Sequence, residues 1–203
     1  MAPFMAYFPK ISDYHAIIFG HVEKKSVLCI LKIIHTNMNK GIQIESREQS
    51  DRQEVYLSLI PQLESLIAGE SNLVGVLANV TAALRTAFGE RFFWVGFYIV
   101  EGERLQLGPF QGTVACFSIG RGRGVCGAAW VREETVIVDD VEQFPGHIAC
   151  SSLSRSEIVV PVKGTNGEVV AVLDIDSTEL KSFDDTDRKG LESICAILGP
   201  LFH

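Results

Sequence analysis

The chain has 203 residues, 47% of them hydrophobic, and carries a formal net charge of −7. This length and composition suit one folded domain with a substantial core, and the acidic balance argues against nucleic acid as the main partner. No run of 18 apolar residues occurs, and the N-terminus fits neither a signal peptide nor a mitochondrial presequence, so we expect a cytoplasmic protein without a membrane partner.

The first fifty residues differ from the rest in charge and in pattern. They hold six Lys or Arg against four Asp or Glu, whereas residues 51–203 hold twelve against twenty-one. No sustained hydrophobic period runs through the first fifty residues. We therefore expect residues 1–50 to be an N-terminal extension of unknown structure and residues 51–203 to form the main domain.

Two helices are predicted at the start of that domain. Apolar residues recur with helical spacing from Tyr56 to Ile67, after which "AGES" ends the helix. A second apolar helical pattern runs from Leu73 to Phe88, with Ser71 as its predicted N-cap. Gly89 is expected to end this helix.

Alternating and apolar runs predict the strands that follow. Strands are expected over Phe92–Val100 and Arg104–Phe110, in a short run through Cys116, and over Thr135–Val138, with a brief helix starting at Val125. The intervening Gly-rich turn carries Arg121 and Arg123, which we expect to be mostly solvated.

The C-terminal third contains a long loop and a hairpin. Residues 140–156 show no period, and a loop of this length in a compact domain is usually functional. Strands over Glu157–Val162 and Glu168–Ser177 are joined by Asn166-Gly167, a strong hairpin signal. A last helix is expected over Asp184–Leu198, with Asp184 capping and Asp187 three residues on. Hairpin-joined strands and flanking helices predict an α+β fold with a mainly antiparallel sheet.

Three carboxylates gather near that hairpin: Glu157, Asp174 and Asp176. A two-residue turn would place Glu157 opposite Asp176, a four-residue loop would place it opposite Asp174, and a three-residue loop would break the pairing. The apolar run "VVAVLDIDS" indicates that both Asp residues are partly buried. Crowded, buried carboxyls raise one another's pKa, which suits gripping an ammonium group and delivering a proton. The alternative is a solvated strand end.

Three of the five cysteines, Cys116, Cys126 and Cys150, fall within one 35-residue stretch. In an acidic protein without a secretory signal, clustered thiols indicate redox or metal chemistry rather than structural disulfides. Their spacing lacks the close cysteine pair of a structural zinc site, so redox catalysis without a metal or other cofactor is favoured. Cys126 begins a helix whose dipole would favour a thiolate. Cys29 and Cys195 are expected to be small buried hydrophobes.

Trp94, Gly96 and Tyr98 alternate along one face of a predicted strand. Two aromatic rings on either side of a residue without a side chain would leave a slot for a small apolar or sulfur-bearing group. Ordinary core packing is the alternative, because aromatic residues favour strands. His147, three residues before Cys150, is only weak support for a catalytic base.

Several segments between Tyr56 and Leu201 resemble those of one family, the free methionine-(R)-sulfoxide reductases, which are built on a GAF domain. They are "WVGFYIV", "LGPFQGTVAC", "GRGVCG", "DDVEQFPGHIAC", "SEIVVPV" and "VLDIDS", in this order. Where the family usually has Pro-x-Gly-Arg-Gly, this chain has "IGRGRG". The resemblance implies a six-stranded antiparallel GAF sheet over residues 51–203, usually in a homodimer. It also implies reduction of free L-methionine (R)-sulfoxide with thioredoxin as the electron donor.

The resemblance also implies a role for each site residue. Cys150 matches the nucleophile, Cys116 the resolving cysteine, and Cys126 a third cysteine that can join the disulfide relay. The residues expected around the substrate are the aromatics near its methyl group, Trp94 and Tyr98, and the carboxylates that bind and polarise it, Glu157, Asp174 and Asp176. Glu157 and Asp176 also count as catalytic, because the sulfoxide oxygen must be protonated.

Two other functions stay open at this point. A GAF module that binds a small ligand and regulates a partner is the first, although such a sensor needs neither a nucleophile–resolver pair nor a carboxylate cluster. A metal site built on the cysteines is the second.

Overall fold

The structure is a computed structural model that describes residues 52–148 and 150–202. The predicted extension, residues 1–50, lies outside the described residues, as does Cys29. In the described part of the chain, no helix is both long and apolar enough to cross a membrane.

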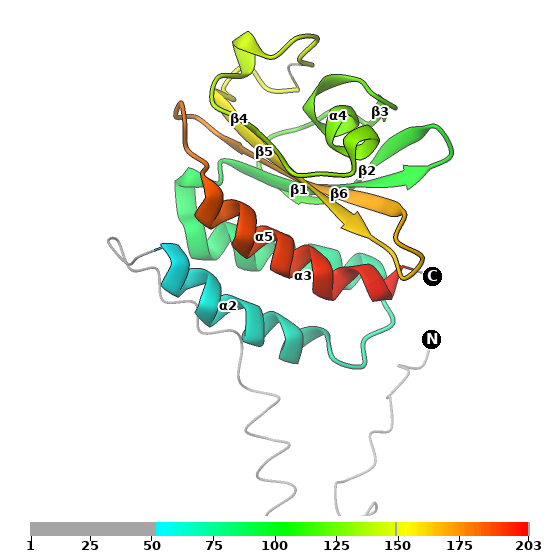
Figure 1. Cartoon of the computed structure of the whole chain (residues 1–203). Coiled ribbons are helices and arrows are strands. Elements are labelled where there is room, and N and C mark those ends of the chain that lie inside the picture. The colour runs from blue at the N-terminus through cyan, green and yellow to red at the C-terminus, as the bar shows by residue number, and fades with distance from the viewer. Residues whose placement is uncertain (1–51, 149, 203) are drawn as a thin grey trace, which may run out of the picture. The chain divides into compact units, whose positions relative to one another are not determined.

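Six strands form one antiparallel sheet in the order β3-β2-β1-β6-β5-β4 (Figure 1). This confirms the predicted six-stranded α+β fold. The strands are β1 (Trp94–Glu101), β2 (Arg104–Gln111), β3 (Ser118–Gly120), β4 (Val136–Val138), β5 (Ser156–Lys163) and β6 (Val169–Ser177).

The predicted strand through Cys116 is wrong, because Cys116 lies in the loop between β2 and β3. Strand β2 ends at Gln111, and Gly112 then adopts a φ of 133°, a backbone conformation that only glycine reaches readily. Pairing resumes only at Ser118, so the cysteine stands on a surface loop rather than in the sheet.

Helices cover both faces of the sheet unequally (Figure 1). Helices α3 (Leu73–Phe88) and α5 (Asp185–Leu198) pack on one face, and α2 (Arg52–Ile67) packs mainly on α5. Helix α4 (Gly124–Arg132) covers the other face, against β5 and β6. Short 3-10 turns occur at Gly89–Arg91, Val141–Gln143 and Gly199–Leu201.

The caps of these helices follow the sequence with one correction. The Asn72 side chain, not Ser71, caps α3 by accepting the Gly75 N–H at 3.1 Å. At α5, Asp184 and Asp187 form the predicted capping box. A capping box satisfies backbone N–H groups that a helix start otherwise leaves unpaired.

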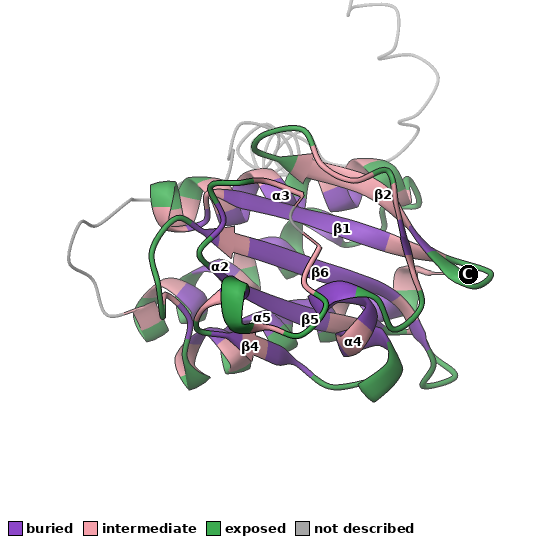
Figure 2. Cartoon of the chain, turned by 90° about the horizontal axis from the view of Figure 1, so that it is seen from above, coloured by how far each residue is buried: buried purple, intermediate pink, exposed green. Residues whose placement is uncertain are grey.

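Burial is nearly continuous along the central strands β1 and β6, which are largely buried in Figure 2. Val95 and Phe97 of β1 are buried on the face toward α3, because side chains alternate across a sheet. Trp94 and Tyr98 join the second core, which includes Cys126 and Trp130 of α4. The sheet therefore has two buried faces, and only the α4 face carries the predicted chemistry.

The β5–β6 hairpin pairs Glu157 with Asp176, as a two-residue turn would, although its loop has the length that we predicted would break this pairing. Gly164 N–H donates to Glu168 O at 2.9 Å, which closes a three-residue loop containing Gly167 at a φ of 84°. A bulge next to Val162 then shifts the register by one residue, so that Glu157 still lies opposite Asp176. Three-residue loops with glycine in the left-handed region commonly occur with such a bulge.

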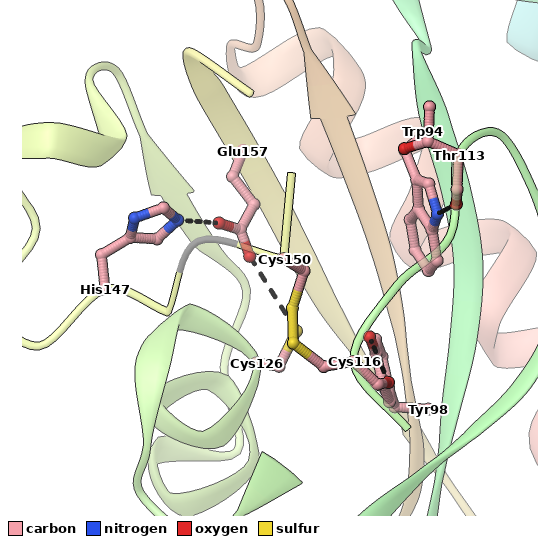
Figure 3. The surroundings of a disulfide bond; sticks show 8 residues. All are labelled: Trp94, Tyr98, Thr113, Cys116, Cys126, His147, Cys150 and Glu157. Atoms are coloured by element: carbon pink, nitrogen blue, oxygen red, sulfur yellow. Dashed lines mark hydrogen bonds and ion pairs between the residues drawn. A yellow bond between two sulfur atoms is a disulfide. The ribbon is translucent and has the colours of Figure 1, made fainter. Parts of the chain in front are cut away.

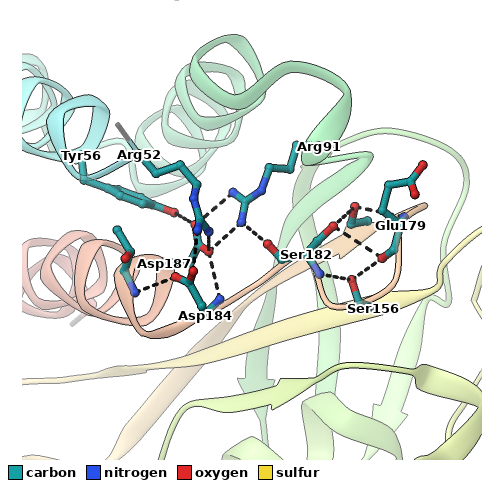
Figure 4. Close-up of polar contacts among 10 residues, drawn as sticks. Arg52, Tyr56, Arg91, Ser156, Glu179, Ser182, Asp184 and Asp187 are labelled. Carbon is teal, nitrogen blue, oxygen red and sulfur yellow. Dashed lines mark hydrogen bonds and ion pairs between the residues drawn. The ribbon is translucent and has the colours of Figure 1, made fainter. Parts of the chain in front are cut away.

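A buried carboxylate fastens α2 to the rest of the domain (Figure 4). The side chain of Asp187 is fully buried and accepts hydrogen bonds from Arg52 at 2.6 Å, from Arg91 at 2.6 and 3.0 Å, and from Tyr56 at 3.0 Å. Arg52 also bonds Asp184. One side chain of α5 thus connects α2, the 3-10 turn after α3 and its own helix start.

Candidate active site

The α4 face of the sheet gathers the predicted carboxylates and aromatics. Glu157 of β5 lies opposite Asp176 of β6, and Asp174 lies two residues before Asp176 on the same face. On the next strand, Trp94 lies opposite Asp176. Gly96 and Tyr98 continue the same face of β1, so the sheet register brings all of these positions together.

Burial raises the pKa values of all three carboxyls, and repulsion from neighbouring carboxylates adds to this for two of them, Glu157 and Asp174. Glu157 and Asp174 are only 5% and 6% exposed. Burial is the main cause for both, followed by the charge of Asp174 and Asp176 on Glu157, and of Asp176 on Asp174. Burial also raises the pKa of the partly buried Asp176 to about 6, although a hydrogen bond from Ser154 opposes this. The cluster therefore retains protons at pH values where exposed carboxyls are ionised.

One oxygen of this cluster lacks a partner. Asp174 Oδ1 is buried and has no hydrogen-bond partner among the described residues. A buried acceptor left without a donor is costly, so it suits a ligand that brings an N–H or O–H group.

A disulfide joins two loops beside the carboxyls (Figure 3). It links Cys116, between β2 and β3, to Cys150, between β4 and β5, with their Cα atoms 5.5 Å apart. Cys150 lines the same small cavity as Glu157, Asp174 and Asp176. The two cysteines that match the family's nucleophile and resolving cysteine are thus joined by a disulfide bond.

The third cysteine, Cys126 of α4, is a buried free thiol in the carboxyl cluster. Its Sγ lies 3.9 Å from Glu157 Oε1 (Figure 3). Burial, and then the charges of Asp174 and Glu157, raise its pKa well above the usual range. The predicted thiolate at this helix start is therefore wrong, because desolvation and two carboxylates outweigh the partial charge of the helix end.

Cys126, Glu157 and Asp174 each offer a ligand atom, and these atoms lie within 4.8 Å of one another. Such a set could hold a divalent cation only after losing its protons, which burial opposes. The same atoms belong to the carboxyl cluster already described, and Cys195, the other free cysteine of the described residues, is buried in α5 away from them.

The two aromatics hold the loop that carries Cys116. Trp94 Nε1 donates to Thr113 O at 2.9 Å, and the Tyr98 hydroxyl donates to Cys116 O at 3.1 Å (Figure 3). The predicted open slot at Gly96 is wrong, because the Trp94 ring lies over this glycine where any Cβ would overlap it. The rings of Trp94 and Tyr98 have centroids 6.0 Å apart. In this disulfide-bonded structure, both residues serve as anchors of the loop.

Two further residues reach the cluster without a strong sequence signal. His147 Nε2 lies 3.8 Å from Glu157 Oε2, and burial lowers the pKa of His147 while the pKa of Glu157 is raised. Both shifts favour neutral groups, so this contact is not a conventional ion pair. Ser154, which hydrogen-bonds Asp176, lies in the irregular loop before β5, and no sequence pattern marked it as a site residue.

The cavity over the carboxyls is small. Its volume is about 30 Å³, and its lining comes from α4, the loop before β5 and the sheet: Ile119, Arg123, Gly124, Val125, Cys126, His147, Ile148, Cys150, Ser154, Glu157, Asp174 and Asp176. A void of this size holds about one or two water molecules, not an amino acid. With the disulfide formed, the site is therefore closed to a substrate of that size.

Comparisons with known proteins agree with this fold. The family model of the GAF domain matches residues 70–203. Free methionine-R-sulfoxide reductase of Escherichia coli is 43% identical over 148 residues, covering 73% of this chain and 88% of that protein. A Dictyostelium discoideum protein named GAF domain-containing protein A is 55% identical over 151 residues, or 74% of this chain and 94% of its own.

A solved structure extends the likeness to three dimensions. Free methionine-R-sulfoxide reductase from Neisseria meningitidis, in complex with its substrate, matches with a TM-score of 0.72 and 50% identity. The match covers 76% of this chain and 92% of that one.

Proposed function

Because the chain belongs to the free methionine-R-sulfoxide reductase family, which is built on the GAF domain, we propose that it reduces free L-methionine (R)-sulfoxide to L-methionine through its cysteine pair. It is an enzyme that needs no bound cofactor for this step, because cysteine thiols supply the electrons. The observation that carries the proposed mechanism is the Cys116–Cys150 disulfide beside three carboxyls with raised pKa values.

In the first step, the Cys150 thiolate attacks the sulfoxide sulfur and forms a sulfur–sulfur bond with it. The protonated oxygen then transfers to Cys150 Sγ as the substrate's sulfur–oxygen bond and this sulfur–sulfur bond break, so methionine leaves with two more electrons and Cys150 becomes a sulfenic acid. The oxygen must take up a proton on the way, and Asp176, with a pKa of about 6, holds one near neutral pH more readily than an exposed carboxyl.

In the second step, the Cys116 thiol attacks the sulfenic sulfur of Cys150, which forms the disulfide and releases water. An external dithiol, which we propose to be thioredoxin, then reduces this disulfide by exchange. The buried, protonated Cys126 is a poor nucleophile by comparison, so we assign resolution to Cys116 and keep Cys126 as a thiol that hydrogen-bonds Glu157.

The carboxyl cluster supports a free amino acid as the substrate. Glu157 and Asp174 are buried where an ammonium group would relieve their repulsion, and the unpartnered Asp174 oxygen would accept one of its N–H bonds. Methionine within a peptide has no ammonium group at that position. A regulatory module that only binds its ligand would not need a cysteine pair that forms a disulfide beside these carboxyls.

The test is methionine formation from purified L-methionine (R)-sulfoxide, with dithiothreitol as the reductant. We expect turnover with the free (R) epimer and at most trace turnover with the (S) epimer or with a peptide containing methionine sulfoxide. Binding without any product would instead support the regulatory GAF module.

A further inference from the structure

Exposed apolar side chains surround the Cys116–Cys150 disulfide. Val114 and Phe117, on either side of Cys116, are 86% and 85% exposed, and Leu153, three residues after Cys150, is 54% exposed. The described residues contain eight large hydrophobic side chains with such exposure, so three of the eight flank one bond. Clustered exposure of this kind indicates an interaction surface rather than chance. We call Val114, Phe117 and Leu153 the disulfide rim.

The segment that carries Cys116 is also basic, in a chain of net charge −7. Residues 104–132 contain four arginines and neither Asp nor Glu. Arg121 and Arg123 are exposed, and Arg121 lies over the Trp130 ring with a weak ion pair to Glu103 at 3.7 Å. A local positive surface on an acidic protein favours encounter with an acidic partner.

The two sulfurs of the disulfide differ in their surroundings. Cys150 lines the cavity over the three carboxyls, which has room for about one or two water molecules and not for the sulfur of a partner protein. Cys116 does not line this cavity; it is half-buried in the loop between β2 and β3, beside the exposed Phe117 and two residues after the exposed Val114. We therefore expect an incoming thiolate to reach Cys116 from the side of these apolar residues, on a segment whose charged residues are all arginines.

We infer that the disulfide rim is the docking surface for an acidic, thioredoxin-like protein dithiol, which attacks Cys116. This inference rests on the proposed function, because the proposed catalytic cycle forms the disulfide at each turnover and needs a reductant to open it. The partner's thiolate bonds to Cys116 Sγ, the disulfide breaks, and the electron pair leaves on Cys150 Sγ as a thiolate. The partner's second thiol then attacks its own sulfur in the mixed disulfide, which closes the partner's disulfide and frees Cys116.

The test compares two double variants that each lose two exposed apolar side chains. Val114→Ser with Phe117→Ser removes the two rim residues beside Cys116. Leu57→Ser with Val74→Ser is the matched control, because these residues are 65% and 63% exposed on α2 and α3, across the sheet from the disulfide. Each protein is assayed with thioredoxin as reductant and, separately, with dithiothreitol.

In the rim variant we expect kcat/KM for thioredoxin to fall about tenfold or more, as when central interface residues are truncated. Dithiothreitol-driven turnover and KM for methionine sulfoxide should stay within about twofold of wild type, and the control variant should match wild type throughout. Added salt should lower kcat/KM for thioredoxin but not the dithiothreitol rate.

A trapping experiment tests the same inference without any sulfoxide. Oxidised protein is mixed with thioredoxin whose second active-site cysteine is replaced by serine, and the mixed disulfide is located by peptide mass spectrometry. We expect it on Cys116, forming more slowly in the rim variant. If wild-type protein made no methionine with dithiothreitol, the proposed function would fail while this trap still tested the docking surface.

Several outcomes would overturn the inference. A mixed disulfide on Cys150, or thioredoxin kinetics in the rim variant equal to those of the control, would remove the docking role. A raised KM for methionine sulfoxide with dithiothreitol would make the rim a cover of the substrate site. A loss of dimer mass in sedimentation, with thioredoxin kinetics intact, would assign the rim to a second copy of the chain. Salt-insensitive thioredoxin rates would contradict the charge argument.

Discussion

Asp176 connects the pKa values of the site to a measurable rate. Its carboxyl lies opposite Glu157 with a pKa raised to about 6, mainly by burial. Asp176→Asn keeps the shape but cannot deliver a proton, so we expect kcat to fall by roughly 10²- to 10⁴-fold, the range typical of general acid groups. Steady-state kinetics with free methionine (R)-sulfoxide measure this. A wild-type rate would show that another group protonates the oxygen.

The same substitution should change stability in a pH-dependent way. The folded-state pKa of Asp176 lies above its ordinary value of 3.8, so the folded protein binds the proton more tightly than the unfolded chain does. The stability that this provides is fully present below about pH 4 and is lost as the pH rises through about 6. Above pH 6, Asp176→Asn should therefore be more stable than wild type by about 1–2 kcal/mol, allowing for the partial exposure of Asp176. Urea denaturation at pH 4 and pH 7 checks this, and an equal difference at both pH values would contradict it.

The two cysteines of the disulfide should respond differently to serine. Cys150→Ser should abolish turnover with any reductant, because an alcohol is too weak a nucleophile for the sulfoxide sulfur. Cys116→Ser should still give one methionine per protein, with a sulfenic acid left on Cys150, while thioredoxin-driven cycling collapses. Rapid-quench product counting and a dimedone label on Cys150 distinguish the two. Continued cycling in Cys116→Ser would make Cys126 the main resolver.

At the scale of elements, Asp187 connects α2, α5 and the 3-10 turn at Arg91 through hydrogen bonds and ion pairs. Asp187→Ala would leave Arg52, Arg91 and Tyr56 without their shared acceptor and would remove the capping box of α5. Because both arginines keep some contact with solvent, we expect a loss of about 3 kcal/mol, at the low end for a broken buried ion pair. The free energy of unfolding in urea measures this. KM for methionine sulfoxide should not change, since the carboxyl cluster lies on the α4 face of the sheet and α5 packs on the other face.

The elements also show what the sequence could predict. Periodic apolar residues identified the helices and most of the strands, and the alternation of "VVAVLDIDS" put Asp174 and Asp176 on one face, as observed. The prediction that a three-residue loop would break the pairing of Glu157 was wrong, because the bulge near Val162 restores the register. A bulge depends on how two strands pair, which no local pattern of one strand contains.

Loop residues and pKa values were harder to predict for a related reason. His147 and Ser154 lie in a segment without a period, so nothing local indicates that they reach Glu157 and Asp176. The helix position of Cys126 suggested a thiolate, but its pKa depends on carboxyls supplied by β5 and β6. Such contacts become visible only when separate elements are assembled.

For the whole molecule, we predict from the small cavity that the redox state of Cys116 and Cys150 controls whether substrate can enter the site. The cavity beside the disulfide has a volume of about 30 Å³ and cannot contain methionine. Cys150 forms part of its wall, and the disulfide ties the loop that carries Cys116 to Cys150. Calorimetry should detect methionine binding to the reduced protein and none, or at least about tenfold weaker binding, to the oxidised protein. The Cys116→Ser variant, which cannot form the disulfide, should bind as the reduced protein does under oxidising conditions. Equal affinity in both redox states would contradict gating by the disulfide.

The folded domain should need more of the chain than the GAF family model matches. The GAF family model begins at residue 70, yet Tyr56, Leu59 and Leu63 of α2 are at most 3% exposed, and Arg52 and Tyr56 bond Asp187. A fragment of residues 52–203 should therefore fold with wild-type activity per molecule, whereas residues 70–203 would expose that apolar face and leave the buried Asp187 with fewer donors. We expect the shorter fragment to lose several kcal/mol of stability or to aggregate. Thermal melts and dithiothreitol-driven assays of both fragments beside the full chain test this. An inactive 52–203 fragment would show that residues before Arg52 contribute to the domain.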